Sequence, residues 1–330
     1  MTDLAFDHHV AQQPDVVAAL LDTESPVLDP DRPIVFTGIG TSLHACRIAA
    51  AWTRIVTGGR VRPAAIDAHD LALSESVRSA DQVVVVSHRG TKRYPNQVLA
   101  AAAEVGASTI AITGVGDNAP VADVVVRTCP QEKASTHTVS YTAALAVLGG
   151  LVARTFDAAD LTEALAGAPT AMRATLELPL PAEAVDAVVS ASPTLVTGTG
   201  LDAITAAEAA LKLKEGTYRW AEGLHTEFAL HGTPAVFSSS TAAFLLRSGA
   251  DGGRTADAQD LLDKLGATTM IVAEDGDVRF AATHPLARPL VTVLPFHRLV
   301  SAAAARLGAN PDLTHLEAEP WASAIRAVQL

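Results

Sequence analysis

The chain has 330 residues, of which 49% are hydrophobic and 18% charged, a balance typical of a folded protein rather than a disordered one. Asp and Glu total 36 against 24 Lys and Arg, so the net charge of -12 argues against general nucleic-acid binding, which needs a basic face. The length allows a large core and favours two domains. A small anionic ligand is still allowed, because one site can be positive on an acidic protein.

Signals for secretion, membrane insertion or disulfide formation are weak in this sequence. The first ten residues are acidic and polar, which does not fit a secretory signal. The apolar run at 143–153 is shorter than the roughly 20 residues that span a bilayer. Cys46 and Cys129 are too few for a disulfide framework and are more consistent with small buried residues. We therefore expect a cytoplasmic protein.

The first half of the chain alternates apolar runs with alanine-rich segments. Pro14 is placed to begin a first helix, and residues 96–107 start at Asn and end at Gly, both helix boundary signals. Runs that are rich in β-branched residues and lack polar alternation are predicted as strands at 34–38, 83–87, 109–113 and 124–127. Such runs are expected of parallel strands covered on both faces, so the pattern predicts a doubly wound α/β sheet.

The second half repeats this pattern. Strands are predicted at 195–200, 268–274 and 290–296, and helices at 202–215 and 257–267. Thr-Gly-Ile-Gly at 37–40 returns as Thr-Gly-Thr-Gly at 197–200, each time between a strand and an alanine-rich helix. We interpret this as an internal duplication. One lobe would cover 1–165 and the other 166–330, connected through the proline-containing stretch 156–181.

The turn after the first strand has the composition of a phosphate-binding loop. Gly40 lets backbone N–H groups approach an anion, the helix dipole adds positive potential, and Thr41 and Ser42 supply hydroxyl donors. The turn lacks both the GxGxxG pattern and the P-loop lysine, so a nucleotide site is disfavoured and no cofactor is expected. On these residues alone, an ordinary capped strand-to-helix turn is an equal alternative.

A second turn of this kind follows the strand at 83–87. It contains the hydroxyls of Ser87 and Thr91, the glycine at position 90, and the cations Arg89 and Lys92, which could bind phosphate oxygens. A solvated loop is the alternative for the charges. Because two strands of one lobe both end in Ser/Thr/Gly turns, we predict that the turns form one anion pocket.

These turns resemble those of the SIS (sugar isomerase) domain family, in particular the isomerase half of glucosamine-6-phosphate synthase and its deaminase relatives. The family's Gly-Thr-Ser turn corresponds to residues 40–42. Its Ser-Gln-Ser-Gly-Glu-Thr loop corresponds to 87–92, with the second Ser and the final Thr replaced by cations. Its Ala-Ser-Thr-Lys segment corresponds to 134–137, with His in place of Lys. Its Glu-Gly-Ala-Leu-Lys-Leu-Lys-Glu helix and later His-Gly correspond to 208–215 and 231–232, so the resemblance spans nearly the whole chain.

The resemblance implies a fold and a set of roles. The implied fold is α/β, with two tandem doubly wound, flavodoxin-like parallel-sheet lobes and an N-terminal helix. The implied ligand is a sugar phosphate, bound by a homodimer in which the second subunit supplies the histidine. Glu215 would move a proton between C1 and C2, and His231 would assist ring opening. The residues implied to bind substrate are Gly40, Thr41, Ser42, Ser87, His88, Arg89, Gly90, Thr91, Lys92, Ala134 and Ser135.

Local sequence also supports a special role for Glu215. Glu208, Lys212 and Glu215 have the spacing of one helix face, and Gly216 predicts the helix end. In a last turn the helix dipole disfavours an anion, which raises the pKa of a carboxyl group toward that of a useful base. Without the resemblance, a surface glutamate is the better interpretation.

The chain also departs from the family pattern. Ile325, with Arg326 beside it, stands where the synthase has a lysine that forms a Schiff base, and arginine cannot replace it because it stays protonated. Asp202 would repel phosphate, so the turn of the second lobe is expected to be empty. His225 and His231 lack the spacing of a zinc helix, and we predict no metal site.

We therefore favour a phosphosugar isomerase or aminosugar-phosphate deaminase that acts without a cofactor and has no nucleic-acid or membrane partner. A non-catalytic sugar-phosphate sensor is the alternative, because two loop residues are altered and the lysine is missing. A nucleotide enzyme is a distant third hypothesis.

Overall fold

The computed structural model describes residues 4–118 and 120–328, which divide into two compact units. The N-terminal unit comprises residues 12–132, 138–166 and those from Ala322 onward. The C-terminal unit comprises the residues up to Ala11, 133–137 and 167–321. This division lies near the predicted boundary at residue 165, but it exchanges three short segments that the prediction did not foresee.

The N-terminal unit is built on a fully parallel five-stranded sheet with the strand order β2-β1-β3-β4-β5. Its strands are β1 (Ile34–Gly38), β2 (Ala64–Asp67), β3 (Gln82–Val86), β4 (Ser108–Val115) and β5 (Val124–Pro130). The four predicted strands are confirmed, and β2 was missed because it is short. This order is that of a doubly wound, flavodoxin-like sheet.

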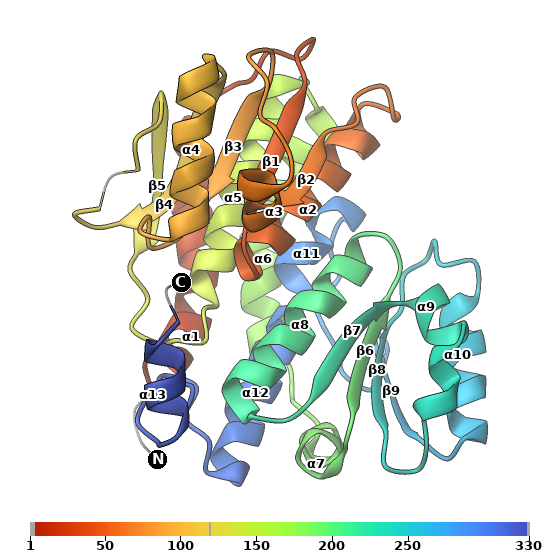
Figure 1. Cartoon of the computed structure of the whole chain (residues 1–330). Helices are drawn as coiled ribbons and strands as arrows, with labels where there is room; N and C mark the ends of the chain where they lie inside the picture. Colours follow the sequence, from red (N-terminus) through yellow and green to blue (C-terminus); the bar gives the residue numbers. More distant parts are fainter. Residues whose placement is uncertain (1–3, 119, 329–330) are drawn as a thin grey trace. The chain divides into compact units, whose positions relative to one another are not determined.

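Helices cover both faces of this sheet, which explains why its central strands are buried throughout (Figure 1, red to yellow-green). The helices are α1 (Ala5–Leu21), α2 (Thr41–Val56), α3 (Ala68–Leu73), α4 (Arg93–Val105) and α5 (Val139–Thr155). One face packs on α3 and α4, with Val35, Val83 and Leu99 in its core. On the other face α2 packs against α5, which is buried over most of its length. Both faces of the central strands therefore lie in apolar cores.

The C-terminal unit repeats this plan with a four-stranded parallel sheet of order β7-β6-β8-β9. Its strands are β6 (Thr194–Gly198), β7 (Ala221–His225), β8 (Ala242–Leu246) and β9 (Thr268–Val272). Its main helices are α6 (Ala159–Glu177), which starts in the other unit, α7 (Ala182–Ser190), α8 (Leu201–Thr217), α9 (Thr226–Leu230), α10 (Arg254–Lys264) and α12 (Leu294–Leu307). Short turns of helix are η1 (Thr233–Val236), η2 (Pro285–Ala287) and α11 (Arg288–Val291); α13 (Trp321–Arg326) starts at the last residue of this unit and otherwise belongs to the N-terminal unit. The order matches the first four strands of the other sheet, as expected of a duplication.

Three sequence predictions about elements were wrong. Residues 290–296, predicted as a strand, lie in α11 and at the start of α12; a short apolar run does not distinguish a buried strand from a buried helix. The predicted connection 156–181 is largely the helix α6. Pro14 lies inside α1 rather than at its start.

A distant carboxylate explains where α1 begins. The two carboxylate oxygens of Asp312 accept the backbone N–H groups of Ala5 and Phe6, at 2.9 and 2.8 Å. They therefore satisfy two of the N–H groups that a helix start leaves unpaired. The cap comes from more than 300 residues away in the sequence, so no local signal marks this helix start.

One helical stretch, Pro285–Leu307, is long and apolar enough to cross a membrane by length and composition. In the C-terminal unit, 67% of its most apolar window is buried inside the protein. Within it, α12 packs on α7 and α8. This stretch therefore has the burial of a core helix, and the apolar run at 143–153 is buried in α5.

Candidate active site

The turn between β1 and α2 depends on two glycines. Gly40 precedes α2 with φ 56° and ψ -124°, a conformation that side chains disfavour. A Cβ on Gly38 would lie 2.8 Å from Ser42 Cβ and 3.0 Å from the Val86 carbonyl oxygen. The first turn of α2 is therefore packed tightly against the ends of β1 and β3. Thr41 and Ser42 begin that helix and are partly exposed, as a ligand-binding turn requires.

Ser87 lies at the end of β3, the strand beside β1. It is buried, and within residues 4–118 and 120–328 its hydroxyl has no hydrogen-bond partner. Its backbone N–H donates to the Ile112 carbonyl at 3.0 Å, which fixes its position. A buried hydroxyl without a partner is costly unless a ligand or water satisfies it. This supports the prediction that Ser87 binds substrate.

His88 and Gly90 shape the loop that follows. The backbone N–H of Glu132 donates to His88 Nε2 at 3.1 Å, and Gln131 Nε2 donates to the His88 carbonyl at 2.8 Å. Gly90, with φ 67°, donates its N–H to the Ser87 carbonyl at 3.0 Å. The imidazole of His88 therefore anchors the loop to the segment after β5, a role that the sequence did not suggest.

Arg89, Thr91 and Lys92 form the outer part of this loop. Arg89 and Thr91 are exposed, and Lys92 is partly buried directly before α4. Burial, and next the positive charge of Arg89, lower the pKa of Lys92. Across the described part of the chain, no carboxylate lies within 4.0 Å of either cation. An anion bound here would therefore relieve a local excess of positive charge.

Glu215 lies on the face of α8 that the sequence predicted. Lys212 Nζ is 2.5 Å from Glu215 Oε2 and 3.6 Å from Glu208 Oε1, so the shared face is confirmed. Lys212 and Glu208 are buried, whereas 31% of the Glu215 side chain is exposed. The outer carboxylate is thus held by a buried ammonium and is still accessible, an arrangement that suits a base acting on a bound molecule.

The predicted helix end at Gly216 was wrong by one residue. The helix α8 continues to Thr217 and ends at Tyr218, whose φ is 59°. A Cβ on Gly216 would lie 2.2 Å from Val300 Cγ1 of α12, so this glycine permits close packing of two helices. Glu215 is nevertheless in the last turn of α8, as expected.

Pro311 joins the segment of Ala134 and Ser135 to the end of α8. Its carbonyl accepts the N–H of Thr136 at 3.1 Å, and its Cβ would lie 3.5 Å from a Cβ on Gly216. The N–H of Ser135 donates to the next carbonyl, that of Asp312, at 2.9 Å, and Ala134 is buried. The loop at 310–312 therefore contacts the Ser135 segment and, through the Asn310 carbonyl, Tyr218 at the end of α8.

His231 is separated from Glu215 within the C-terminal unit. From the carboxyl end of β6, α8 runs back along the sheet, and Glu215 lies roughly 20 Å from its first residue at 1.5 Å per residue. His231 follows the carboxyl end of β7, and its side chain is 72% exposed. Within one chain, Glu215 therefore lies toward the amino ends of the strands and His231 beyond their carboxyl ends. This arrangement agrees with a histidine that acts on another subunit.

Several residues near Glu215 were missed by the sequence analysis. The Tyr218 ring stacks on His315 with centroids 3.6 Å apart, and His315 stacks on Trp321 at 4.4 Å. The Tyr218 hydroxyl donates to the Asn310 carbonyl at 2.8 Å. Because Tyr218 lies 92 positions from Asn310 and 97 from His315 in the sequence, no local spacing could have revealed these contacts.

A pocket of about 400 Å³ in the C-terminal unit contains none of the predicted site residues. It is lined by Asp7, Val10, Ala11, Leu176, Leu180, Arg298, Ser301 and Ala302. Among the residues that the structure describes, no group of three or more His, Cys, Asp or Glu side chains could hold a metal ion. That the protein acts without a metal stays a prediction.

Comparison with known proteins identifies the family. Residues 28–154, which contain the two Ser/Thr/Gly turns, match the SIS domain model. Residues 28–154 therefore belong to the SIS domain family. A curated relative of the chain is glutamine–fructose-6-phosphate aminotransferase (isomerizing) of Shouchella clausii, 28% identical over 311 residues. That match covers 88% of this chain and 51% of the relative, so the chain spans about half the length of the curated relatives it matches.

Solved structures share the two-sheet SIS fold. The C-terminal domain of glucosamine-fructose-6-phosphate aminotransferase from Francisella tularensis has a TM-score of 0.82 at 19% identity, covering 94% of this chain and 98% of that one. Glucosamine-6-phosphate deaminase from Thermotoga maritima has a TM-score of 0.78 at 18% identity, covering 94% and 97%. The predicted α/β fold with two parallel sheets and an N-terminal helix is thereby confirmed.

Proposed function

We propose that this protein is a phosphosugar isomerase or an aminosugar-phosphate deaminase that moves a proton between C1 and C2 of a sugar phosphate. The observation that carries the proposal is the position of Glu215. It is partly exposed on the last turn of α8 and held by Lys212 at 2.5 Å. Two similar proteins have names that describe this kind of reaction, an isomerizing aminotransferase and a deaminase, and they support the same reaction class.

The substrate phosphate is proposed to bind at the turns of the N-terminal unit. Ser42 and Thr41 would donate from the first turn of α2, and the unsatisfied hydroxyl of Ser87 would donate from the end of β3. Arg89 and Lys92 would add charge-assisted contacts. Phosphate binding there would use remote binding energy to hold the sugar carbons for reaction.

The proposed chemistry needs one base and one ring-opening group. Glu215 would take the proton from one carbon and return it to the neighbouring carbon, with Lys212 countering the unfavourable field of the helix end. His231 would open the ring from a second copy of the chain, so the active form would be a homodimer. Because the sequence from Gly308 onward contains no lysine, a Schiff base formed by the tail is not part of the proposal. Action in the cytoplasm without a cofactor stays a prediction.

Glu215→Gln tests the base directly. Loss of a positioned base should lower kcat by roughly 10²- to 10⁴-fold, while thermal stabilisation by sugar phosphates is retained. Gln keeps the size of the side chain, and Lys212 keeps Glu208 as a partner. Glu222→Gln, at an exposed glutamate of β7, is the matched control and should leave turnover unchanged. Equal activity in the Glu215 variant and the wild type would exclude Glu215 as the base.

A sugar-phosphate sensor is the second candidate, favoured by the lysine-free tail. The two functions are distinguished by assaying wild-type protein with hexose and hexosamine phosphates, using the unphosphorylated sugars as controls. Binding together with an isomerised sugar or released ammonia supports the enzyme. Binding without any product across the panel supports the sensor.

A further inference from the structure

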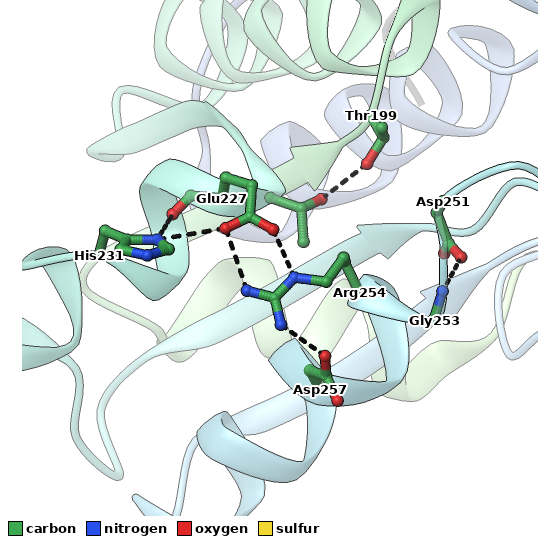
Figure 2. A network of polar contacts seen from close by, with 8 residues as sticks. Thr199, Glu227, His231, Asp251, Gly253, Arg254 and Asp257 are labelled. Atoms are coloured by element: carbon green, nitrogen blue, oxygen red, sulfur yellow. Dashed lines mark hydrogen bonds and ion pairs between the residues drawn. The ribbon is translucent and has the colours of Figure 1, made fainter.

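The imidazole of His231 is held through one of its two nitrogens. Its Nδ1 lies 2.7 Å from the Glu227 backbone carbonyl and 3.2 Å from Glu227 Oε2, as Figure 2 shows. Both of these oxygens act as hydrogen-bond acceptors, so Nδ1 carries the proton. In the neutral ring the other nitrogen, Nε2, is then the basic atom. With 72% of the side chain exposed, His231 is accessible to a bound molecule.

A second ion pair restrains Glu227. Arg254, the first residue of α10, contacts Glu227 Oε1 through Nε, and its Nη2 lies 3.0 Å from Glu227 Oε2. Arg254 Nη1 in turn lies 2.6 Å from Asp257 Oδ2. The hydrogen bond from Arg254, followed by its charge and that of His231, lowers the pKa of Glu227. Glu227 therefore stays ionised across the range in which a histidine titrates.

The two helices that bear these groups are also fixed at their starts. The Thr199 hydroxyl donates to the Thr226 hydroxyl at 3.4 Å, at the first residue of α9. The Gly253 N–H donates to Asp251 Oδ1 at 2.9 Å, directly before α10 (Figure 2). These contacts restrain the relative positions of Glu227 and Arg254.

We propose that Glu227 and Arg254 are positioning residues that fix the tautomer of His231 and set the pH range in which its Nε2 exchanges a proton. The inference rests on the proposed role of His231 in ring opening. Glu227 supplies the negative charge beside the ring, and Arg254 offsets part of that charge. Nε2 of the neutral ring is thereby left to exchange a proton with a bound molecule. Neither residue has to touch the substrate.

Other charged groups near α9 are few. The elements that pack on it are β6, β7, η1 and α10. On β7 the titratable residues are Glu222 and His225, and η1 and β6 carry none. On α10 they are Arg254, Asp257, Asp260, Asp263 and Lys264. Of these groups, only Arg254 is in ion-pair contact with Glu227.

Opposite substitutions test the inference. The measurement is an NMR titration of the His231 ring in the full chain, with ¹⁵N shifts reporting its tautomer. Glu227→Gln removes the anion and should lower the titration midpoint by up to about one unit, while Arg254→Met unmasks the carboxylate and should raise it. Lys264→Met removes an exposed ion pair with Asp260 elsewhere on α10 and should cause no shift. The double variant Glu227→Gln/Arg254→Met should have a midpoint between those of the two single variants, because each charge acts on the ring in its own right.

The outcomes separate this inference from the proposed function. Opposite shifts, with Nδ1 protonated in the wild type, support it. Shifts of the same sign, no shift beyond the Lys264 control, or a wild-type ring protonated on Nε2 overturn it. Turnover is scored separately. If wild-type protein turns over no sugar phosphate, the proposed function fails while the midpoints still decide the role of Glu227 and Arg254. If it does, the acid limb of kcat/KM should move with the midpoint.

Discussion

The turns before α2 and α8 have nearly the same backbone conformation but carry different side chains. Gly40 has φ 56° and ψ -124°, and Gly200 has φ 61° and ψ -123°. A Cβ on Gly38 would lie 2.8 Å from Ser42 Cβ, and one on Gly198 would lie 2.8 Å from Asp202 Cβ. The Gly-X-Gly motif therefore builds the same turn twice. The backbone geometry alone does not make a binding site.

The side chain at the second helical position marks the difference. Ser42 is partly exposed and offers a neutral hydroxyl. Asp202 is buried, and Arg288 Nη2 and Nε lie 2.6 and 3.0 Å from its Oδ2. The sequence analysis predicted an empty turn because Asp202 would repel phosphate; the structure shows a carboxylate that already has a cation. The second side chain of α8 is therefore buried and paired, whereas that of α2 is accessible to a ligand.

Removing the cation of the second turn should have the largest effect. Arg288→Met leaves a buried carboxylate without its partner and should lower the free energy of unfolding by about 3–5 kcal/mol, measured by urea denaturation. Asp202→Asn combined with Arg288→Met should recover part of that loss. If the single variant is as stable as wild type, the pair does not hold the second turn.

This loss should depend on pH. Burial raises the pKa of Asp202, and Arg288 opposes that rise. A carboxyl group with a raised folded-state pKa holds its proton more tightly in the folded state, so its contribution to stability falls as pH rises through that range. Without Arg288 the pKa of Asp202 rises further. The variant should therefore be less destabilised at mildly acidic pH than at neutral pH, and a constant difference would contradict this.

At the first turn, loss of a hydroxyl should affect binding rather than folding. Ser42→Ala should weaken sugar-phosphate binding by roughly 10- to 100-fold, because a hydrogen bond to a charged group contributes about 1.5–3 kcal/mol. Its unfolding free energy should change by less than about 0.5 kcal/mol. Calorimetric titration measures the first quantity and urea denaturation the second. If Ser42→Ala lowered the unfolding free energy without weakening binding, Ser42 would have a structural role, like Asp202 in the second turn.

Substitutions of Gly40 and Gly200 should have similar effects on stability but different effects on binding. Gly40→Ala and Gly200→Ala both place a side chain in a conformation that only glycine adopts readily, so each should cost about 1–3 kcal/mol of stability. Only the Gly40 variant should also lose sugar-phosphate affinity. Thermal unfolding with and without ligand checks both points, and a loss of affinity in the Gly200 variant would place the ligand elsewhere.

The smallest effects are expected at the two cations of the loop after β3, the exposed Arg89 and the partly buried Lys92. Lys92→Gln and Arg89→Gln should each weaken binding only a few-fold, because exposed ion pairs contribute about 0–1 kcal/mol. The effect should shrink at high salt, where exposed charges are screened. Affinity measured at two ionic strengths tests this. Arg62→Gln, at another exposed arginine of the same unit, is the control.

Local sequence was sufficient to predict features that are set by residues close to one another in the chain. The β-branched runs specified four of the five strands of the first sheet; for β1 and β3 the reason is burial on both faces, which leaves no polar alternation, and for the edge strand β5 it is β-propensity. The spacing of Glu208, Lys212 and Glu215 placed them on one helix face, since helical geometry alone sets that relation. Both Gly-X-Gly turns were recognised for the same reason.

Tertiary structure decided what depends on distant partners. Arg288 reaches Asp202 across 86 positions, Asp312 caps a helix more than 300 positions away, and Arg254 reaches Glu227 across 27. Sequence patterns report which face of an element is buried, whereas the topology selects the charges that face each other. The sequence by itself thus determined most of the first sheet and the two glycine turns, whereas the strands β7 and β8 of the second sheet were missed. Only the folded chain determined that the carboxylate of the second turn is paired with Arg288 while Ser42 of the first stays accessible.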